Sequence, residues 1–394
     1  MENTHYDVII AGAGPAGTTA ATLLAQYGHR VLLIERDKHP RFHIGESMLP
    51  MSEPVMKRLG IDWATGNQKK GGAEFIDEVS GRQTYFPLAG KYRTFQVERS
   101  IFDERLFDNA VSQGVEARQQ ENVTQVACSE AEVNIETDKA SYQGRYFIDA
   151  TGRNAIMGKK LASINKIADL GKFALYQHYK LADSAEARAL YEHGNVKIFL
   201  SAIGWIWCIP LTGERLSVGL VVQKESPNNL KQAELFAQYI NASPYMASLL
   251  QEAEVLSEVS IEADFSYQNT QRHGQRFACC GDASGFLDPV FSSGFFFALK
   301  TAEFVADQLH TGLLAGTEED PELHVSSDEF YQIGFKTMHR LIERFYGSNL
   351  VENLFFESDR QLNIKQEIAD LLAGDLWQED NGFQQGLLRG RSKK

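Results

Sequence analysis

The sequence lacks several features that would assign it to a functional class at once. Its 394 residues include only four cysteines, and their spacing matches neither a metal site nor a disulfide framework. The formal net charge of −13 disfavours nucleic acid binding, because affinity for a phosphate backbone depends on clustered lysine and arginine. No apolar run reaches the roughly 18 residues of a membrane-spanning helix, and the first apolar run is too short for a signal peptide. We therefore expect no metal, no nucleic acid, no transmembrane segment and a cytoplasmic location.

Composition and length are those of a folded protein of two or three domains. Hydrophobic residues make up 43% and charged residues 23% of the chain. Residues 6–11 and 31–35 are nearly continuous apolar runs, which predict strands buried on both faces. Residues 18–27 between them are rich in Ala and Leu and favour a helix. This strand–helix–strand unit predicts an α/β fold with a parallel, Rossmann-like sheet.

A glycine-rich turn lies between the first predicted strand and the helix. Gly12, Gly14 and Gly17 have the G-x-G-x-x-G spacing. In that pattern the first glycine permits a tight turn, the second lets the backbone approach a pyrophosphate, and the third lets helix and strand pack closely. Glu35 ends the second strand, 23 residues after Gly12, where an acid accepts a ribose hydroxyl. The pattern predicts dinucleotide binding, and a glycine-rich turn without a ligand is the alternative.

Three further segments distinguish FAD from NAD. Arg99 could lie near a phosphate, residues 149–152 end a strand, and Asp282 in Gly-Asp-Ala-Ser-Gly could hydrogen-bond a ribityl chain. Each alone could be an ordinary turn. Together, and in this order, they resemble the FAD-dependent oxidoreductases of the glutathione-reductase and aromatic-hydroxylase type. The FAD contacts that this implies are Gly12, Gly14, Ala16, Gly17, Glu35, Arg36, Arg99, Val123, Asp282 and Gly294. No second G-x-G-x-x-G is present, so electrons would come from transiently bound NAD(P)H or from another protein.

The rest of the chain interleaves two kinds of sheet with helices. Residues 172–222 contain short β-type runs separated by polar turns, which predict an antiparallel sheet. Helices are expected over residues 100–114 and 293–314, and from about residue 325 onward. The predicted domains are therefore discontinuous. They are an FAD-binding domain over residues 1–75, 96–155 and 262–345, a substrate domain over 76–95 and 156–261, and a helical C-terminal segment over 346–394.

Several motifs then point to one family. They are the glycine turn, Pro-Arg-Phe-His-Ile-Gly-Glu-Ser at 40–47, Lys-Gly-Gly-Ala-Glu-Phe at 70–75, Gly-Trp-Ile-Trp-Cys-Ile-Pro at 204–210, and Asp-Pro-Val-Phe-Ser-Ser-Gly at 288–294. With them the chain resembles the flavin-dependent halogenases, in the branch that acts on phenols, pyrroles and carrier-protein-tethered aromatics. A pattern related to W-x-W-x-I-P also occurs in geranylgeranyl-reductase-like flavoproteins. The D-P-V-F-S-S-G loop is the more discriminating of the two motifs.

The resemblance implies roles for individual residues. Lys70 is the expected catalytic residue, holding hypohalous acid or forming a haloamine, although the adjacent Lys69 is an alternative. The amides of Ser293 and Gly294 would hold chloride or bromide. The expected substrate-side residues are Trp205, Trp207 and Phe297. The two tryptophans alternate on a predicted strand and so share one face, where the family's indoles stop direct oxygen transfer. The alternative for all three aromatic residues is a place in the hydrophobic core.

The resulting functional expectation is a halogenase that depends on reduced FAD from a separate flavin reductase. It would convert halide and oxygen to hypohalous acid and halogenate a phenol, pyrrole or indole, either free or tethered to a carrier protein. Tryptophan halogenases carry a glutamate at the position of Phe291, so its replacement disfavours free tryptophan. The alternatives are a geranylgeranyl-reductase-like oxidoreductase, an aromatic monooxygenase, and a flavin-binding protein without turnover.

Overall fold

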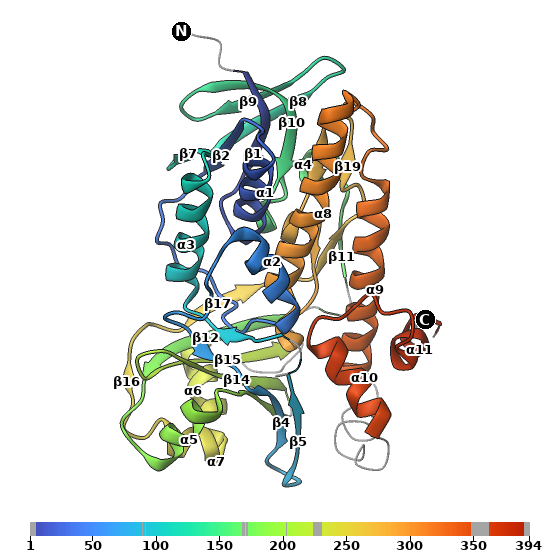
Figure 1. Cartoon of the computed structure of the whole chain (residues 1–394). Coiled ribbons are helices and arrows are strands. Elements are labelled where there is room, and N and C mark those ends of the chain that lie inside the picture. The colour runs from blue at the N-terminus through green and yellow to red at the C-terminus, as the bar shows by residue number, and fades with distance from the viewer. Residues whose placement is uncertain are drawn as a thin grey trace.

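The computed structural model describes residues 5–389, except 89, 91, 168–169, 171, 202, 224–230 and 348–361. Two large sheets dominate the described chain, one in each half of the elongated molecule (Figure 1). Long helices run along one side of it, and the last helices lie beside the second sheet. The parallel sheet, the antiparallel sheet and the helical C-terminal part that the sequence predicts are all confirmed.

The first sheet has a parallel centre with strand order β20-β10-β1-β2-β7. An antiparallel strand, β19, pairs with β20 at its edge, and the hairpin of β8 and β9 extends from β10. Strand β1 is central because its residues are apolar on both faces, as the sequence indicates. The strands are β1 His5–Ala11, β2 Val31–Glu35, β7 Glu116–Gln119, β8 Val123–Cys128, β9 Val133–Thr137, β10 Ser141–Asp149, β19 His273–Gly274 and β20 Phe277–Cys279.

Helices cover one face of this sheet and the hairpin covers the other. Small residues of the Ala-rich helix α1 let it pack closely between the strands and α8. The helices on this face are α1 Pro15–Gln26, α2 Glu53–Leu59, α3 Arg99–Ser112 and α8 Gly294–Ala315. On the opposite face, β8, β9 and α4 Ile156–Lys160 bury a second apolar cluster. The carboxyl ends of β1, β2 and β10 therefore open onto the loops that carry the predicted cofactor contacts.

The second sheet has the order β16-β12-β15-β14-β13-β4-β5, with β17 also paired to β12. Its pairings are antiparallel except for β13 with β4. Its strands are β4 Gly72–Asp77, β5 Arg82–Pro87, β12 Lys172–Lys180, β13 Val196–Ser201, β14 Gly204–Leu211, β15 Arg215–Gln223, β16 Glu254–Val255 and β17 Ser260–Ala263. Two expected domain boundaries fall inside these strands, because residue 75 lies within β4 and residue 262 within β17. A boundary that keeps this sheet whole lies before residue 72 and after residue 263.

Each face of the second sheet meets a different set of helices. Helices α5 Ala185–His193, α6 Gln232–Ala242 and α7 Pro244–Leu249 cover one face. The other face packs on the first turns of α8 and on α9 Val325–Gly347, α10 Leu362–Leu372 and α11 Gly382–Arg389. Part of the expected C-terminal segment, residues 348–361, lies outside the described residues. This face of the sheet buries the two indoles of β14 against the start of α8. Because α8 also packs on the first sheet, these contacts join the two halves of the molecule.

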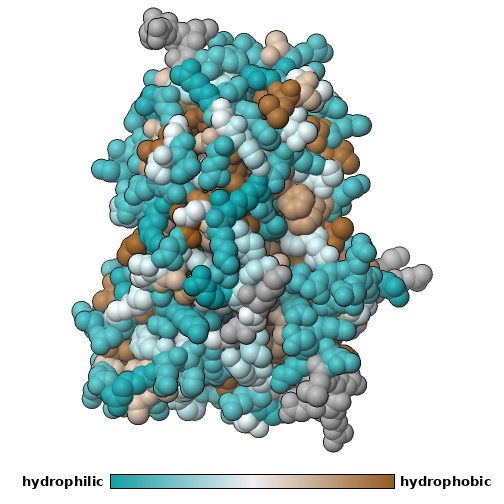
Figure 2. All heavy atoms as spheres, in the orientation of Figure 1, coloured by the Kyte–Doolittle hydropathy of each residue, from teal (hydrophilic) through white to brown (hydrophobic). Residues whose placement is uncertain are grey.

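Two small sheets lie outside the two large ones. Strands β11 Ile164–Lys166, β18 Tyr267–Asn269 and β21 Gly285–Phe286 form a small sheet, and β3 Gln68–Lys69 pairs with β6 Phe95–Gln96. The face shown in Figure 2 is mostly polar, with apolar residues scattered over it. None of the helices described is long and apolar enough to cross a bilayer.

Candidate active site

The glycine turn combines tight packing with one open position. A Cβ atom on Gly12 would lie 2.3 Å from the Ala150 carbonyl oxygen, and one on Gly17 would lie 1.8 Å from the Gly12 oxygen. Gly14 has no backbone neighbour within 4 Å of its would-be Cβ, and the nearest atom is Nη2 of Arg41 at 3.6 Å. Gly14 also caps the N-terminus of α1 without a capping side chain, which leaves amide donors for an anion. This cradle fits the pyrophosphate of a dinucleotide.

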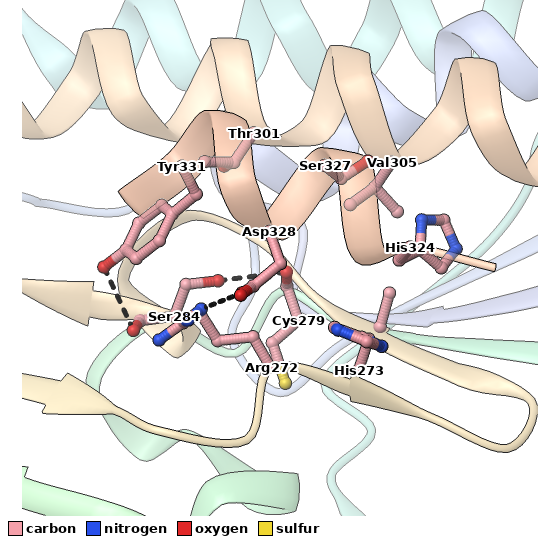
Figure 3. Close-up of a pocket in the computed structure, with 11 residues that line it drawn as sticks. Arg272, His273, Cys279, Ser284, Thr301, Val305, His324, Ser327, Asp328 and Tyr331 are labelled. Carbon is pink, nitrogen blue, oxygen red and sulfur yellow. Dashed lines mark hydrogen bonds and ion pairs between the residues drawn. The ribbon is translucent and has the colours of Figure 1, made fainter. Parts of the chain in front are cut away.

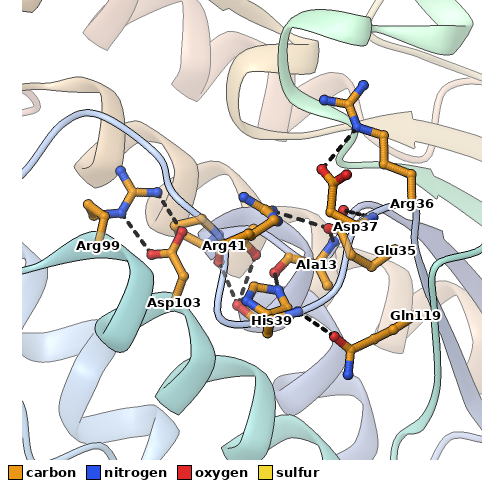
Figure 4. A network of polar contacts seen from close by, with 12 residues as sticks. Ala13, Glu35, Arg36, Asp37, His39, Arg41, Arg99, Asp103 and Gln119 are labelled. Carbon is orange, nitrogen blue, oxygen red and sulfur yellow. Dashed lines mark hydrogen bonds and ion pairs between the residues drawn. The ribbon is translucent and has the colours of Figure 1, made fainter. Parts of the chain in front are cut away.

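Glu35 links the end of β2 to the glycine turn (Figure 4). Its Oε2 accepts hydrogen bonds from the Ala13 amide at 2.7 Å and from Arg41 Nη2 at 3.1 Å, and Oε1 accepts one from the Asp37 amide at 3.0 Å. The side chain is buried at the end of β2, the position from which the sequence predicts a contact to a ribose. The sequence did not indicate that Arg41 contacts Glu35, although Arg41 lies in the motif at 40–47.

Three other predicted cofactor contacts occupy different settings. Arg36 is exposed and pairs with Asp37 at 3.3 Å. The Val123 side chain is buried in the apolar cluster beneath the hairpin. Ala16 packs against the loop after β20, where a Cβ on Gly281 would approach the Ala16 Cβ to 2.8 Å. The structure thus places Ala16 against the loop that carries Asp282.

Arg99 is buried and already holds several partners. Its guanidinium forms a bidentate ion pair with Asp103, with both N–O distances at 2.7 Å, and donates to the backbone oxygens of Ile44 and Gly45. It also lies near Asp282, whose pKa is raised to about 6 by burial despite the opposing charge of Arg99. Arg99 therefore fixes the loop over residues 41–50 and places positive charge beside the predicted ribityl contact.

Lys70 and Lys69 have opposite environments. The Lys69 side chain is exposed, whereas Lys70 is only 2% exposed. Nζ of Lys70 donates hydrogen bonds to Ser47 Oγ at 2.8 Å and to the Met48 carbonyl oxygen at 2.9 Å. Burial lowers the pKa of Lys70 to about 7, and within the described part of the chain no carboxylate pairs with it. Lys70 is thus an amine near its neutral form, held by two uncharged acceptors.

The two tryptophans of β14 lie on one face, as expected. Their ring centroids are 6.0 Å apart, and both side chains are buried. The Trp207 indole donates to Ser217 Oγ at 3.1 Å, and the Trp205 indole donates to the hydroxyl of Tyr346 at 2.6 Å. Their face belongs to the same apolar cluster as Phe291, in the turn before α8, and Phe297, in the first turn of α8.

The loop over 288–294 is an ordered turn that ends in a helix. Asp288 Oδ1 accepts the Val290 amide at 2.9 Å, and Ser292 adopts a left-handed conformation with φ of 55°. Ser293 then caps α8 without a capping side-chain bond. Among the described residues, the amides of Ser293 and Gly294 have no hydrogen-bond partner. Two free N–H groups at the N-terminus of a long helix suit an anion.

Phe297 occupies an aromatic cluster that includes a residue from the C-terminal segment. Its ring lies 6.2 Å from those of Phe296 and Tyr331 and 6.4 Å from that of Trp377. Phe297 is 8% exposed, so it belongs to the core that backs the start of α8. The contribution of Trp377 was not predicted, because nothing local in its sequence marks it.

A small cavity lies between α8, α9 and β20 (Figure 3). Its volume is about 20 Å³, enough for one water molecule and too little for an aromatic ring. Tyr331 on its wall donates to the Ser284 carbonyl oxygen at 3.1 Å, and Arg272 pairs with Asp328 beside it. The cavity is therefore too small to be the substrate site, and the Tyr331 hydrogen bond on its wall holds the loop at Ser284.

Comparison with known proteins gives a consistent result. The chain matches the family described as Tryptophan halogenase over residues 7–93 and 83–387. A relative from Pseudomonas fluorescens, named as a chlorinase of 1H-pyrrole-2-carbonyl peptidyl-carrier protein, is 28% identical over 96% of this chain and 91% of its own. A flavoprotein/dehydrogenase structure from Cytophaga hutchinsonii is 27% identical with a TM-score of 0.88, covering 97% of this chain and 96% of its own. The structure of the flavin-dependent brominase Bmp2 is 26% identical with a TM-score of 0.86, covering 98% of both chains.

These findings confirm the family resemblance drawn from the motifs and the FAD dependence drawn from the glycine turn. The family match spans both sheets and the C-terminal helices, so it does not rest on the nucleotide-binding half alone. The chain belongs to the tryptophan halogenase family and is an FAD-dependent enzyme of the flavin-dependent halogenase type.

Proposed function

We propose that the enzyme makes hypohalous acid from halide and oxygen, and that Lys70 delivers the halogen to an electron-rich aromatic ring. The observation that carries the proposal is the setting of Lys70, a buried amine bonded to two neutral oxygens with no carboxylate paired to it among the described residues. Such burial costs folding free energy, and groups with strongly shifted pKa values concentrate at functional sites. Lys69 is exposed and offers no comparable reason for a role.

The residues for FAD fit this chemistry. The amides at Gly14 and the start of α1 would bind the pyrophosphate, Glu35 the ribose, and Asp282 the ribityl chain. When bound, reduced FAD supplies the two electrons, so that FADH2, O2, halide and one proton become FAD, hypohalous acid and water. We propose that a separate flavin reductase provides the reduced cofactor, since only one G-x-G-x-x-G is present in the chain.

The halide would sit at the N-terminus of α8. The amides of Ser293 and Gly294 point to this role because neither has a partner among the described residues. The helix behind them has 22 residues, and its dipole favours a negative charge at this end. Because Ser292 is in the left-handed conformation, the chain reverses there, and this sets the direction in which the next two amides point.

Lys70 has the donors and the lone pair that halogen transfer requires. With two N–H groups bonded to Ser47 and Met48, the neutral amine keeps its lone pair free. Attack of the lone pair on hypohalous acid would form an N–halogen bond and break the halogen–oxygen bond. The departing hydroxide would take one proton from the amine and leave as water. The ring would then take the halogen and return its proton to the amine. In the alternative, the ammonium form hydrogen-bonds the acid and the ring takes the halogen directly.

The substrate we propose is a pyrrole, phenol or indole, free or tethered to a carrier protein. The pyrrole-carrier chlorinase supports the tethered form, since it aligns with almost the whole chain. Trp205, Trp207 and Phe297 would form the aromatic wall on this side of the flavin. Phe291 takes the place of a family glutamate, which disfavours free tryptophan. The cytoplasmic location remains a prediction from the cysteines.

The deciding experiment combines the purified chain with FAD, an unrelated flavin reductase, NADH and either bromide or chloride. Phenols, pyrroles, indoles and a pyrrole-loaded carrier protein are supplied in turn, and the products are analysed by mass spectrometry. We expect a halogenated product that requires both halide and reductase. A product formed equally without halide would support the reductase-like alternative. Rapid substrate-stimulated NADPH oxidation by the chain alone would support the monooxygenase.

The cofactor assignment has its own test in Gly14→Val. A branched side chain would enter the open space beside Arg41, where the pyrophosphate is proposed to lie. We expect the affinity for FAD to fall about a hundredfold or more, while the circular dichroism spectrum is retained. Flavin fluorescence titration measures the affinity, with Gly386→Val as a matched control, because Gly386 is exposed in α11 and a Cβ there meets nothing within 4 Å. Retention of wild-type FAD affinity by Gly14→Val would contradict the assignment.

A further inference from the structure

A buried chain of polar groups connects the W-x-W strand to the loop that precedes the proposed halide site. The Trp205 indole donates to the Tyr346 hydroxyl at 2.6 Å, and that hydroxyl lies 3.2 Å from both carboxylate oxygens of Asp288. Nζ of Lys172 lies 3.6 Å from Asp288 Oδ2 and 3.6 Å from the centroid of the Tyr346 ring. Trp205, Asp288 and Lys172 are each at most 2% exposed.

The chemistry of these groups fixes the direction of their hydrogen bonds. An indole N–H can only donate, so the Tyr346 oxygen accepts from Trp205 and its proton points to Asp288. Asp288 therefore accepts hydrogen bonds from the Tyr346 hydroxyl and from the Val290 amide at 2.9 Å, and it forms an ion pair with Lys172. A carboxylate with this many partners has one preferred position, because moving it would leave buried polar groups unpaired.

Asp288 begins the turn that aims the free amides of Ser293 and Gly294. Between them, the Ser292 amide bonds the Pro289 carbonyl oxygen at 3.0 Å, and Ser292 holds its left-handed conformation. A non-glycine residue keeps that conformation only when its surroundings impose it. The Val290 amide of this turn donates to Asp288. The contacts that hold Asp288 against α9, β12 and β14 therefore also hold the turn in place.

We propose that Tyr346, Lys172 and Trp205 are positioning residues for the halide: they hold Asp288, and through it the amides of Ser293 and Gly294, in the geometry that binds the anion. The inference rests on the proposed function, which places the halide at these amides. It gives Trp205 a second task, in addition to its place on the substrate side. None of the three positioning side chains contacts the halide in this proposal.

The test is Tyr346→Phe, which removes one hydroxyl and keeps the ring beneath Lys172. We expect KM for bromide to rise on the order of tenfold, because the amides would be less well aligned. Both kcat at saturating bromide and the affinity for FAD should stay within about twofold of wild type. Tyr191→Phe is the matched control, since its partly buried hydroxyl donates to the Arg215 carbonyl oxygen on another part of the fold. Its bromide KM should equal that of wild type.

Two results would overturn the inference without touching the proposed function. One is an unchanged bromide KM in an active Tyr346→Phe. The other is a variant in which kcat and the melting temperature both fall while the bromide KM stays at the wild-type value, which indicates a structural role alone. If Tyr346→Phe fails to fold, Trp205→Phe decides, because it removes the donor that fixes the Tyr346 hydroxyl toward Asp288. We expect its bromide KM to rise, and an unchanged bromide KM rejects the inference. Failure of the wild type to halogenate any substrate would instead reject the proposed function.

Discussion

Two lysines are buried to the same degree within the described residues, and their surroundings differ. Lys70 and Lys172 are each about 2% exposed. Lys172 faces the carboxylate of Asp288, which opposes the lowering of its pKa by burial. Lys70 meets a serine hydroxyl and a backbone oxygen, and burial alone lowers its pKa to about 7. One site therefore holds an ion pair, and the other holds an amine that can lose its proton near neutral pH.

This difference distinguishes a lysine whose burial is compensated by an ion pair from one whose burial is not. A buried ion pair is accounted for by the partner that compensates its desolvation, as Asp288 does for Lys172. An unpaired buried amine gains no such compensation, so its presence at Lys70 calls for an explanation outside folding. The following predictions test the contrast, beginning with the largest effect.

The largest effect is expected on halogen transfer. Lys70→Ala should lower the rate of product halogenation on the order of a thousandfold, because it removes the group that we propose orients the oxidant. Oxidation of reduced FAD by oxygen should continue at close to the wild-type rate, since the glycine turn and α8 are untouched. Stopped-flow absorbance follows the flavin, and mass spectrometry follows the product.

The neighbouring lysine supplies the control for this prediction. Lys69→Ala should behave like wild type, because its side chain is exposed. Undiminished product from Lys70→Ala would remove that residue from the reaction. A dead Lys69→Ala beside an active Lys70→Ala would move the proposed role to the adjacent lysine.

The next effect concerns stability, and here the order of the two lysines reverses. Lys172→Met leaves the Asp288 carboxylate buried without its cation, so we expect the free energy of unfolding to fall by about 3 kcal/mol. Lys70→Met loses two hydrogen bonds but also removes an unpaired amine, so its stability should stay within about 1 kcal/mol of wild type. Urea unfolding at pH 7 compares the two variants. Equal losses in both would mean that the two environments are energetically alike.

This contrast also shows how far the sequence could be interpreted. The strand at 6–11, the glycine turn and the helix at 293–314 were predicted because each is encoded locally, by a run of apolar residues or by spacing. The motif favoured Lys70 over Lys69, but the sequence did not predict their difference in burial, because that depends on how β3 and the loop carrying Ser47 fold around the side chain. Nor does any sequence pattern bring Lys172 to Asp288, since long-range packing of β12 on the loop over 288–294 creates that pair.

The Lys70 pKa also predicts how stability varies with pH. Lys70 loses its proton near pH 7 in the fold, whereas a lysine in the unfolded chain keeps it to about pH 10.4. Between these values the unfolded state binds more protons, so the contribution of Lys70 to stability becomes more favourable as pH rises. The free energy of unfolding of wild type, relative to Lys70→Met, should increase by about 2 kcal/mol from pH 7 to pH 9. Parallel urea-unfolding results for the two proteins across this range would contradict the shifted pKa.

The smallest effect is on the pH dependence of transfer itself, and it distinguishes the two forms of the amine. If neutral Lys70 takes the halogen on its lone pair, the rate should follow the deprotonated fraction of a group with pKa about 7. That fraction rises about tenfold between pH 6 and pH 8. We expect this rise in rapid-quench measurements of a single turnover, with the product quantified by mass spectrometry. Tyr191→Phe should show the same profile, because its hydroxyl bonds Arg215 and not the amine.

A rate that instead falls through pH 7 would indicate that the ammonium form of Lys70 is the active one, donating a hydrogen bond to hypohalous acid. A rate independent of pH through this range would show that Lys70 does not titrate there, and the distinction from Lys172 would then lie only in its hydrogen-bond partners.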